Sequence, residues 1–415
     1  MSSPPDDRTR SRTGRREDPV DRRIREIDER VTSLREHAQY TYLQPVAAVE
    51  GASVTINGRR LLLASSYSYL GLLGHPAIQT AARAAIEHYG TGTHGVRLLA
   101  GNTDLHDRLE QRIAAFVGAD AAVVYSSGYL TNVAVISSLL GKGDLVVCDK
   151  LNHASIVDGC LLSRAKLVRV SHNDAAAMDR ALAQAPGAAG KLVVVDAVFS
   201  MDGDVINLPA VVETCRRHDA RLMVDESHSL GVLGASGRGI EERFGLPGTI
   251  GLKMSSLSKS IPSAGGYIAG DDDLITFLKH ASRAFVFSAA LPPASAAAAL
   301  AAFDVIEAEP ERVARVQSNA RQLRAMLRRG GLPVRDDPTP IIPVITGSDD
   351  AAMQMSRELF DRGFFVPPVV SPAVPPGAAR LRVTVTAAHT EAEVDGIAAA
   401  VVEAWHTVTA PAVSG

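Results

Sequence analysis

The chain has 415 residues, of which 46% are hydrophobic and 21% charged, a balance typical of a soluble globular protein with a sizeable core. The 43 basic and 46 acidic residues give a net charge of -3, which argues against a general nucleic-acid binder. The sequence has neither an apolar run of membrane-spanning length nor the apolar core of a secretion signal, so we expect a cytoplasmic protein without a membrane span. Three cysteines, Cys148, Cys160 and Cys215, exclude a disulfide scaffold, and we expect them to be small buried side chains.

The first 65 residues show three patterns. Residues 1–20 mix Pro, Ser, Gly and Arg with acidic residues and lack apolar periodicity, which predicts a disordered, mixed-charge arm. Residues 21–40 carry the interleaved charges of an exposed helix. Residues 53–63 contain two β-prone runs around Asn57-Gly58, a two-residue turn signal, and therefore predict a β-hairpin.

Helical and strand patterns alternate through the middle of the chain. The predicted helices are residues 76–89, 104–116 and 130–140, and the predicted strands are residues 121–125, 145–148, 191–195 and 221–224. Continuous Val/Leu strands separated by helices are typical of a mostly parallel sheet that is covered by helices on both faces. We therefore expect an α/β domain whose chemistry gathers at the carboxyl ends of its strands.

The composition changes near residue 291. Predicted helices follow at residues 294–309, 313–329 and 391–405, with predicted strands at 340–344 and 380–384. This pattern predicts a smaller α+β domain. The expected organisation is an arm at 1–20, a helix and hairpin at 21–65, a large domain at 66–290 and a small C-terminal domain at 291–415.

Polar residues follow the predicted strands of the large domain. Ser127 and Gly128 come after the first strand and open a helix, an arrangement that suits a phosphate, although Ser and Gly also serve as ordinary caps. His153 follows the second strand, where a hydrogen-bonded core histidine is the simpler interpretation. Ser200 lies in a segment that could be an ordinary turn.

Two further segments are more specific. Asp225 directly follows a strand and His228 lies three residues on, so that a carboxylate and an imidazole can share one cleft. Lys259 stands among serines and glycines, and taken alone it would be interpreted as a solvated loop lysine. A phosphate turn, a histidine, a carboxylate and a lysine at successive strand ends together fit pyridoxal 5'-phosphate (PLP), which needs a Schiff-base lysine and a carboxylate at its pyridinium nitrogen.

These motifs, in this order, resemble the α-oxoamine synthases of the fold-type-I PLP enzymes. That family includes 8-amino-7-oxononanoate synthase, 2-amino-3-ketobutyrate CoA ligase, 5-aminolevulinate synthase and serine palmitoyltransferase. The resemblance runs from about residue 67 to residue 389 and rests on Tyr69-Leu-Gly71, Gly90 to Gly95 with Arg97 and His106, Asn152-His153-Ala-Ser155, Phe199 to Gly203, Asp225 to His228, Gly234 to Gly239, Ser258-Lys259, Phe287-Ser288 with Leu291-Pro-Pro293, and Arg382 with His389-Thr390. It implies the fold-type-I transferase fold, a large domain with a mostly parallel sheet and a smaller α+β C-terminal domain.

The resemblance also implies a role for each site residue. Lys259 would carry PLP as its Schiff base and then act as base and acid at the substrate Cα. Asp225 would pair with the pyridine nitrogen and keep it protonated, and His153 would stack on the ring. His228 and Ser200 would face the phenolic oxygen.

The phosphate and the substrate would be held by other residues. The phosphate ligands implied by the resemblance are Ser127, Gly128, Tyr129 and Ser256. Arg382 would bind the carboxylate of the amino acid as a planar fork. Three positions depart from the family pattern: Ser68 where many members place an assisting Asn, Val96 before the arginine of the glycine-rich loop, and Ala289 where many members reach the phosphate of a neighbouring subunit.

The implied reaction is a decarboxylating Claisen-type condensation. A small amino acid (glycine, alanine or serine) would react with an acyl-CoA or acyl-carrier-protein thioester to give an α-amino ketone, carbon dioxide and free thiol. Two alternatives stay open: a CoA-dependent ligase or lyase of the 2-amino-3-ketobutyrate type, and a non-catalytic partner subunit. The segment around Lys259 resembles the serine palmitoyltransferase-like branch, a homodimer is the family expectation, and no metal site is expected among the scattered histidines.

Overall fold

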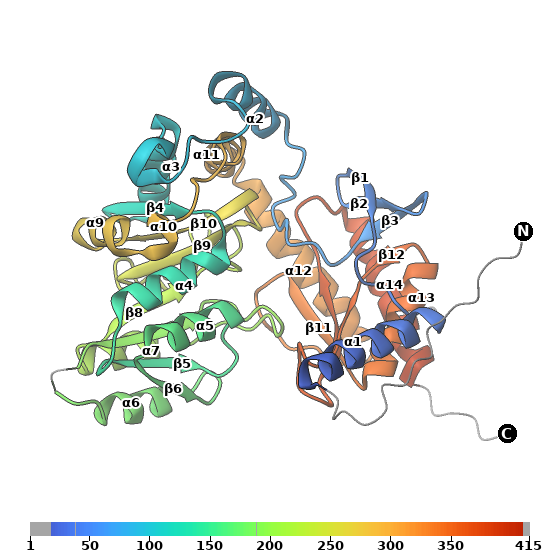
Figure 1. The fold of residues 1–415 in the computed structure, drawn as a ribbon. Coiled ribbons are helices and arrows are strands. Elements are labelled where there is room, and N and C mark those ends of the chain that lie inside the picture. The colour runs from blue at the N-terminus through green and yellow to red at the C-terminus, as the bar shows by residue number, and fades with distance from the viewer. Residues whose placement is uncertain (1–17, 38, 188, 410–415) are drawn as a thin grey trace, which may run out of the picture. The chain divides into compact units, whose positions relative to one another are not determined.

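The computed structural model describes residues 18–37, 39–187 and 189–409, and its contacts divide the chain into units of residues 1–44 and 45–415 (Figure 1). The first unit contains α1 (Pro19–Glu36), and the side chain of its N-cap Asp18 accepts a hydrogen bond from the Val20 amide at 2.8 Å. The predicted helix is confirmed with shifted ends, because Asp18 and Pro19 together form a helix start. Of the predicted arm, residues 1–17 lie outside the described residues. Pro19 and Val20 are helical, which corrects the end of the arm.

The second unit is built on a seven-stranded sheet in the order β4-β10-β9-β8-β7-β5-β6. Its strands are β4 (Ala121–Tyr125), β5 (Leu145–Asp149), β6 (Lys166–Val170), β7 (Lys191–Asp196), β8 (Arg221–Asp225), β9 (Leu252–Ser258) and β10 (Pro262–Gly270). From β6 to β9 every neighbouring pair is parallel, whereas β10 runs antiparallel to both β9 and β4. The predicted mostly parallel sheet is therefore confirmed.

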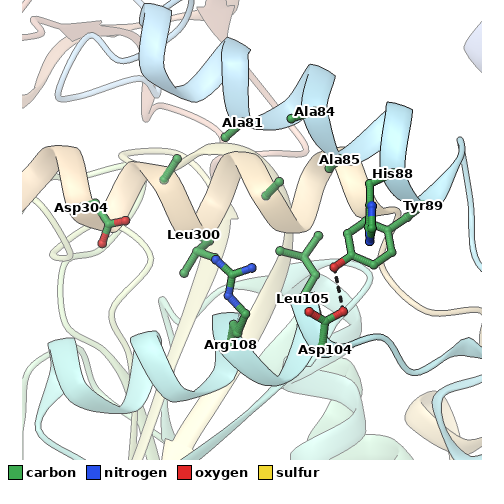
Figure 2. Close-up of a pocket in the computed structure, with 12 residues that line it drawn as sticks. Ala81, Ala84, Ala85, His88, Tyr89, Asp104, Leu105, Arg108, Leu300 and Asp304 are labelled. Atoms are coloured by element: carbon green, nitrogen blue, oxygen red, sulfur yellow. Dashed lines mark hydrogen bonds between the residues drawn. The ribbon is translucent and has the colours of Figure 1, made fainter.

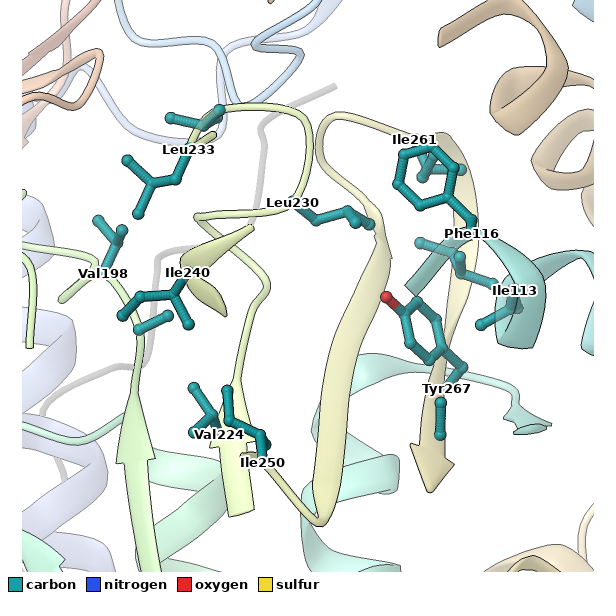
Figure 3. Packing of buried hydrophobic residues seen from close by; sticks show 14 of the residues in the cluster. Ile113, Phe116, Val198, Val224, Leu230, Leu233, Ile240, Ile250, Ile261 and Tyr267 are labelled. Carbon is teal, nitrogen blue, oxygen red and sulfur yellow. The ribbon is translucent and has the colours of Figure 1, made fainter. Parts of the chain in front are cut away.

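Apolar clusters cover both faces of this sheet. In β7, Val193 and Val195 belong to one cluster and Leu192 and Val194 to another, because successive side chains of a strand point to opposite faces. Figure 3 shows part of the first cluster, in which Tyr267 of β10 lies near side chains of α3. The helices between and beside these strands are α2 (Pro76–Tyr89), α3 (Asp104–Val117), α4 (Gly128–Leu139), α5 (Ala154–Ser163), α6 (Ala175–Ala183), α7 (Leu208–Arg217), α8 (Ile240–Phe244), α9 (Asp272–Ala281), α10 (Arg283–Val286) and the π-helix η1 (Arg97–Gly101).

The C-terminal part of the chain adds a second core. The elements of this part of the chain are α11 (Pro293–Ala308), α12 (Glu311–Arg329), β11 (Ile341–Gly347), α13 (Asp349–Asp361), β12 (Phe364–Phe365), β13 (Pro368–Val369), β14 (Ala379–Thr384) and α14 (Glu391–Thr409). Of these, α11 packs against α2 and α3, and its buried side chains belong to the first cluster on the large sheet. Strands β11, β14 and β13 form a three-stranded sheet, and Leu323, Leu381 and Val401 belong to its apolar cluster. The domain boundary near residue 291 stays a prediction, since residues 45–415 form one compact unit.

The predicted hairpin is present, within a larger sheet. Strands β2 (Ser53–Ile56) and β3 (Arg59–Leu63) meet at Asn57 and Gly58, whose φ angles of 51° and 74° match a tight left-handed turn. Strand β1 (Val46–Glu50) pairs with β2, and β12 pairs in parallel with β3. Neither pairing was predicted. The pairing of β12 has no local signal, because β12 is two residues long and its Phe364 pairs with the distant Leu62.

The cysteines and the absence of a membrane-spanning helix were both predicted from the sequence. The three cysteines are buried and free, as expected. Among the described residues, no helix combines the length and the apolar character that crossing a membrane requires.

Candidate active site

A pocket of about 260 Å³ lies at the carboxyl ends of the sheet strands and brings the predicted cofactor residues together. Every residue predicted to touch the cofactor lines it: Ser127, Gly128, Tyr129, His153, Ser200, Asp225, His228, Ser256 and Lys259. A larger cavity of about 530 Å³ between α2, α3 and α11 contains none of them (Figure 2). The structure therefore brings these polar residues together in one pocket, and their roles stay predictions.

One end of the pocket is the N-terminus of α4. The hydroxyl of the N-cap Ser127 accepts a hydrogen bond from the Leu130 amide at 3.1 Å, and the first amides of a helix have no partner within the helix. A Cβ atom at Gly128 would lie 2.9 Å from the Cβ of Ser256, so only glycine allows the two segments to approach so closely. The hydroxyls of Ser256 and Ser258 are 2.6 Å apart. Free amides, a positive helix end and hydroxyl groups form a cradle that suits a phosphate.

Asp225 provides a fixed carboxylate in the same pocket. It ends β8 and is buried, and it accepts hydrogen bonds from the Ser227 amide at 2.9 Å and from Nδ2 of Asn132 at 2.8 Å. Nδ2 of Asn132 also donates to the Ser155 hydroxyl at 2.9 Å. Among the described residues, Oδ1 of Asn132 has no hydrogen-bond partner although it is buried and lines the pocket. A carboxylate that accepts two hydrogen bonds is well placed to face a protonated ring nitrogen.

His153 is held by contacts on two sides. Its Nδ1 lies 2.7 Å from the Ser155 hydroxyl and 3.3 Å from the Ser155 amide, and its own amide donates to Oδ2 of Asp196 at 2.8 Å. Burial lowers the pKa of His153, so the neutral imidazole is favoured. Burial, with the nearby Asp225 charge, raises the pKa of Asp196 well above its usual range.

Lys259 lies between β9 and β10 and lines the pocket with Asp225 and Asp196. Burial lowers the pKa of its amine, although the charges of Asp225 and Asp196 act in the opposite direction. An amine with a lowered pKa is the group that both Schiff-base formation and proton abstraction require. The lysine, the carboxylate and the phosphate cradle therefore fit PLP.

A second group of residues surrounds Arg382 of β14. Its Nε donates to the Ser200 carbonyl at 2.5 Å, and one Nη donates to the Tyr69 hydroxyl at 3.1 Å. The Tyr69 hydroxyl is also 2.7 Å from Nδ1 of His228. The Arg382 guanidinium lies 4.6 Å from the centre of the Tyr67 ring. Hydrogen bonds thus link Arg382 to two residues that line the pocket.

Neither of the two predicted substrate ligands, Arg382 and Ser68, lines the pocket itself, and within the described part of the chain Ser68, unlike Arg382, has no side-chain hydrogen bond that links it to the pocket. Its side chain is buried, and among the described residues its hydroxyl has no hydrogen-bond partner. Its amide donates to the Ser66 hydroxyl at 3.0 Å, which fixes the backbone next to Tyr67 and Tyr69. The role of Ser68 in binding substrate therefore stays a prediction.

Several residues that contribute to this geometry were not predicted as site residues, among them Asp196, Asn132, Tyr67 and Tyr69. Asp196 could have been found from its position, since it ends β7, but the predicted strand stopped one residue earlier. Asn132 lies inside α4, and Tyr67 and Tyr69 lie in the loop between β3 of the small hairpin sheet and α2, away from the carboxyl ends of the large-sheet strands in the printed sequence. Tyr69 belongs to a motif of the family resemblance, which gave it no role in the site, and no local pattern marks Asn132 or Tyr67.

Comparisons with known proteins identify the family. The model of the aminotransferase class I and II family matches residues 60–401. The chain is 44% identical to the 8-amino-7-oxononanoate synthase of Geobacter sulfurreducens over 91% of this chain and 97% of that protein. It is 39% identical to the serine palmitoyltransferase of Sphingobacterium spiritivorum over 88% of this chain and 92% of that protein.

Solved structures agree with the sequence relatives. The serine palmitoyltransferase of Sphingomonas wittichii superposes with a TM-score of 0.91 at 32% identity, covering 94% of this chain and 99% of that one. A serine palmitoyltransferase structure that contains PLP gives the same values. The 8-amino-7-oxononanoate synthase of Francisella tularensis gives a TM-score of 0.71 at 25% identity over 83% of this chain and 97% of that one. These likenesses confirm the predicted fold-type-I transferase fold and PLP as the cofactor of the family.

Relatives with both enzyme names match over most of the chain, so the branch that the Lys259 segment resembles stays a prediction. The chain belongs to the aminotransferase class I and II family and, within it, to the α-oxoamine synthases, PLP-dependent acyltransferases that condense an amino acid with an acyl thioester and release carbon dioxide.

Proposed function

We propose that this chain condenses glycine, alanine or serine with an acyl thioester carried by coenzyme A or by an acyl carrier protein. The products would be an α-amino ketone, carbon dioxide and a free thiol. The observation that carries this proposal is the pocket that places Lys259, an amine of lowered pKa, beside the buried carboxylate of Asp225. PLP, when bound, supplies an electron sink that stabilises negative charge at the substrate Cα.

Lys259 has the properties of the group that moves the Cα proton. Burial lowers the pKa of its amine and so shifts the equilibrium toward the neutral form, in which Nζ can accept a proton and return it later. Asp225, held by the Ser227 amide and by Asn132, presents its carboxylate to the pocket, where it would pair with the ring nitrogen. The neutral imidazole of His153, fixed by Ser155, would pack against the ring without adding a charge.

Arg382 is the proposed carboxylate ligand. Its hydrogen bonds to the Ser200 carbonyl and the Tyr69 hydroxyl fix the plane of the guanidinium, while burial shields it from water. A planar, oriented guanidinium matches a carboxylate with two parallel hydrogen bonds. The buried Ser68 hydroxyl, which has no partner among the described residues, could accept or donate a further bond to the substrate.

We further propose that the enzyme works as a homodimer in the cytoplasm. Leu99 of η1 and Phe287 are 84% and 71% exposed, and the bridge between Val96 and Ala289 places their segments side by side. Large apolar side chains gathered on a surface are typical of an interface. Light scattering of the purified protein tests this proposal, and a monomer at micromolar concentration would contradict it.

The test of the reaction is an absorbance titration of the purified holoenzyme with glycine, alanine and serine, each with and without a long-chain acyl thioester. We expect the visible band of the lysine-bound cofactor to shift with one amino acid, and carbon dioxide to be released once the thioester is added. Lys259→Ala should abolish the band, and Lys142→Ala, which removes an exposed lysine outside the pocket, should keep it.

Three results would contradict the proposal. A band that persists in Lys259→Ala would show that another lysine carries the cofactor. A protein that stays colourless with added PLP would favour the non-catalytic partner subunit. An enzyme that cleaves an amino ketone with coenzyme A but never releases carbon dioxide would favour the ligase or lyase.

A further inference from the structure

A separate cavity of about 420 Å³ lies between the loop before α8 and helix α12. It shares no lining residue with the candidate active site. Three arginines line it, Arg243 from α8 and Arg321 and Arg324 from α12, together with one carboxylate, Glu242. The formal charge of these lining side chains is therefore positive.

Arg324 is buried without a matching anion. Its side chain is 4% exposed, and its hydrogen bond runs from Nη2 to the Ile341 carbonyl at 3.1 Å. Among the described residues, no carboxylate lies within ion-pair distance of it. The two acidic side chains whose charges act on it, Asp337 and Asp336, form ion pairs with Arg335 and Arg328 instead.

A buried cation of this kind is costly, because taking a charge out of water is unfavourable unless an opposite charge compensates it. Burial lowers the pKa of Arg324 to about 10, but the guanidinium is still a cation at neutral pH. Its single hydrogen bond to the protein uses one of the five N–H donors of the guanidinium.

Arg243 and Arg321 extend the positive charge to the mouth of the cavity. Both are exposed, and within the part of the chain that the structure describes neither forms an ion pair. The Arg243 guanidinium lies over the Phe244 ring at 5.7 Å. Both side chains can therefore turn toward a ligand without giving up an ionic partner.

The carboxylate of Glu242 does not neutralise these arginines. Its Oε1 accepts hydrogen bonds from the Ser236 amide at 2.9 Å and the Ser236 hydroxyl at 2.7 Å, and its Oε2 accepts one from the Arg238 amide at 2.9 Å. These bonds hold the loop that forms one wall of the cavity. Glu242 thus shapes the wall, and the arginines determine which charge the cavity accepts.

We propose that this cavity binds the phosphate group of a small molecule. Planar guanidinium forks match phosphate oxygens with paired hydrogen bonds, and a tetrahedral anion can be reached by several arginines at once. The phosphate would be either free inorganic phosphate or the phosphate of a larger ligand such as coenzyme A. This site is distinct from the PLP phosphate cradle at α4 and does not depend on the reaction proposed above.

The test is calorimetric titration of inorganic phosphate into the PLP-saturated holoenzyme, so that the cradle at α4 is already filled. Chloride balances the ionic strength in every sample, because exposed charges are screened by salt. The test variant Arg243→Gln/Arg321→Gln changes two exposed side chains and leaves the buried Arg324 in place. The matched control is Arg315→Gln, an exposed arginine of the same helix that does not line the cavity.

We expect saturable binding of one phosphate per chain, at least tenfold weaker in the double variant and within twofold of the original value in Arg315→Gln. Heat no greater than that of the chloride control, or equal affinity in the double variant, would overturn the proposal. A second arm adds coenzyme A: loss of phosphate binding would assign the site to the phosphates of the thioester carrier, and unchanged binding would assign it to free phosphate. None of these readouts depends on catalytic activity.

Discussion

His172 links three segments of the large sheet through two buried carboxylates, and its replacement should change both the stability of the fold and its pH dependence. Nδ1 lies 3.1 Å from Oδ2 of Asp149, at the end of β5, and Nε2 lies 2.7 Å from Oδ2 of Asp204, after β7. The side chains of Asp149 and Asp204 are 0% and 2% exposed, and that of His172 is 20% exposed. Its ring also meets Phe199, next to Ser200 of the site, edge-on at 4.4 Å.

Burial alone would lower the pKa of His172, but the hydrogen bonds to Asp149 and Asp204 outweigh it and raise the pKa from 6.5 to about 9. The folded state therefore binds a proton more tightly than the unfolded state. This contribution to stability is complete below about pH 6.5 and is lost as the pH rises through 9. Converting the whole pKa difference into free energy at about 1.4 kcal/mol per pH unit would give roughly 3.5 kcal/mol. Solvent screening of the partly exposed ring reduces this contribution to about 2 kcal/mol.

We expect His172→Gln to lower the free energy of unfolding by about 2–3 kcal/mol near pH 6, because it removes the cation between two buried carboxylates. Near pH 9.5 the difference in unfolding free energy between the two proteins should be about 2 kcal/mol smaller, because His172 is then largely neutral in the original protein. Urea unfolding followed by circular dichroism measures both values. His280→Gln, which changes an exposed histidine on α9, is the control and should show neither effect. A His172→Gln protein with unchanged stability at pH 6, or with the same deficit at both pH values, would refute this reasoning.

Two further substitutions test the site. Asn132→Leu removes a hydrogen bond to the carboxylate of Asp225 that is worth about 1.5–3 kcal/mol. Equilibrium dialysis should therefore show that PLP dissociates about ten- to a hundredfold more readily from the variant. Unchanged retention of PLP would mean that the Ser227 amide alone is enough to hold Asp225 in place. Tyr67→Leu removes the aromatic face beside Arg382, and a cation–π contact of about 0.5–2 kcal/mol predicts a two- to thirtyfold rise in KM for the amino acid. Tyr67→Phe keeps the ring and should keep KM; an equal rise in both variants would point to the hydroxyl instead.

The elements that the sequence predicted well carry their signals locally. Helix α2 matches its prediction at both ends, because Pro76 occupies the first turn and Gly90, with a φ of 82°, ends the helix. Strand β4 also matches, because a run of apolar residues buried on both faces needs no alternation to be identified. Such signals depend on a few neighbouring residues and not on the rest of the fold.

Strand β10 shows why other elements were missed. It contains Pro262 and several glycines, a composition that argues against a strand. The structure explains one of those glycines, since a Cβ at Gly266 would lie 2.6 Å from the Cα of Gly128. The strand must allow α4 to approach closely at the phosphate cradle, and tertiary packing therefore overrides local propensity. The close approach of α4 at the phosphate cradle requires a glycine in β10, and the glycines of this strand make it hard to predict from the sequence.

The site residues also divide into those that a local sequence signal predicts and those that only tertiary packing brings to the site. Asp225 and His153 were found because polar residues after buried parallel strands meet at one edge of the sheet. Asn132 could not be found, because its contact with Asp225 spans 93 residues and depends on how α4 packs on the sheet. It lies in the middle of a helix, where an asparagine gives no signal of its own.

The distribution of charge within the pocket selects its ligand. The N-terminus of α4 presents a positive end at Gly128, and Asn132, one turn further, holds the carboxylate of Asp225. Four residues of helix rise by about 6 Å along the axis, so α4 anchors the positive helix end and the carboxylate of Asp225 about one turn apart. A ligand that fits both must carry an anionic group at one end and a protonated nitrogen at the other, with an electrophilic carbon within reach of Lys259 between them. PLP has this arrangement, and a ligand with one charge alone would leave either the helix end or Asp225 uncompensated in a buried site.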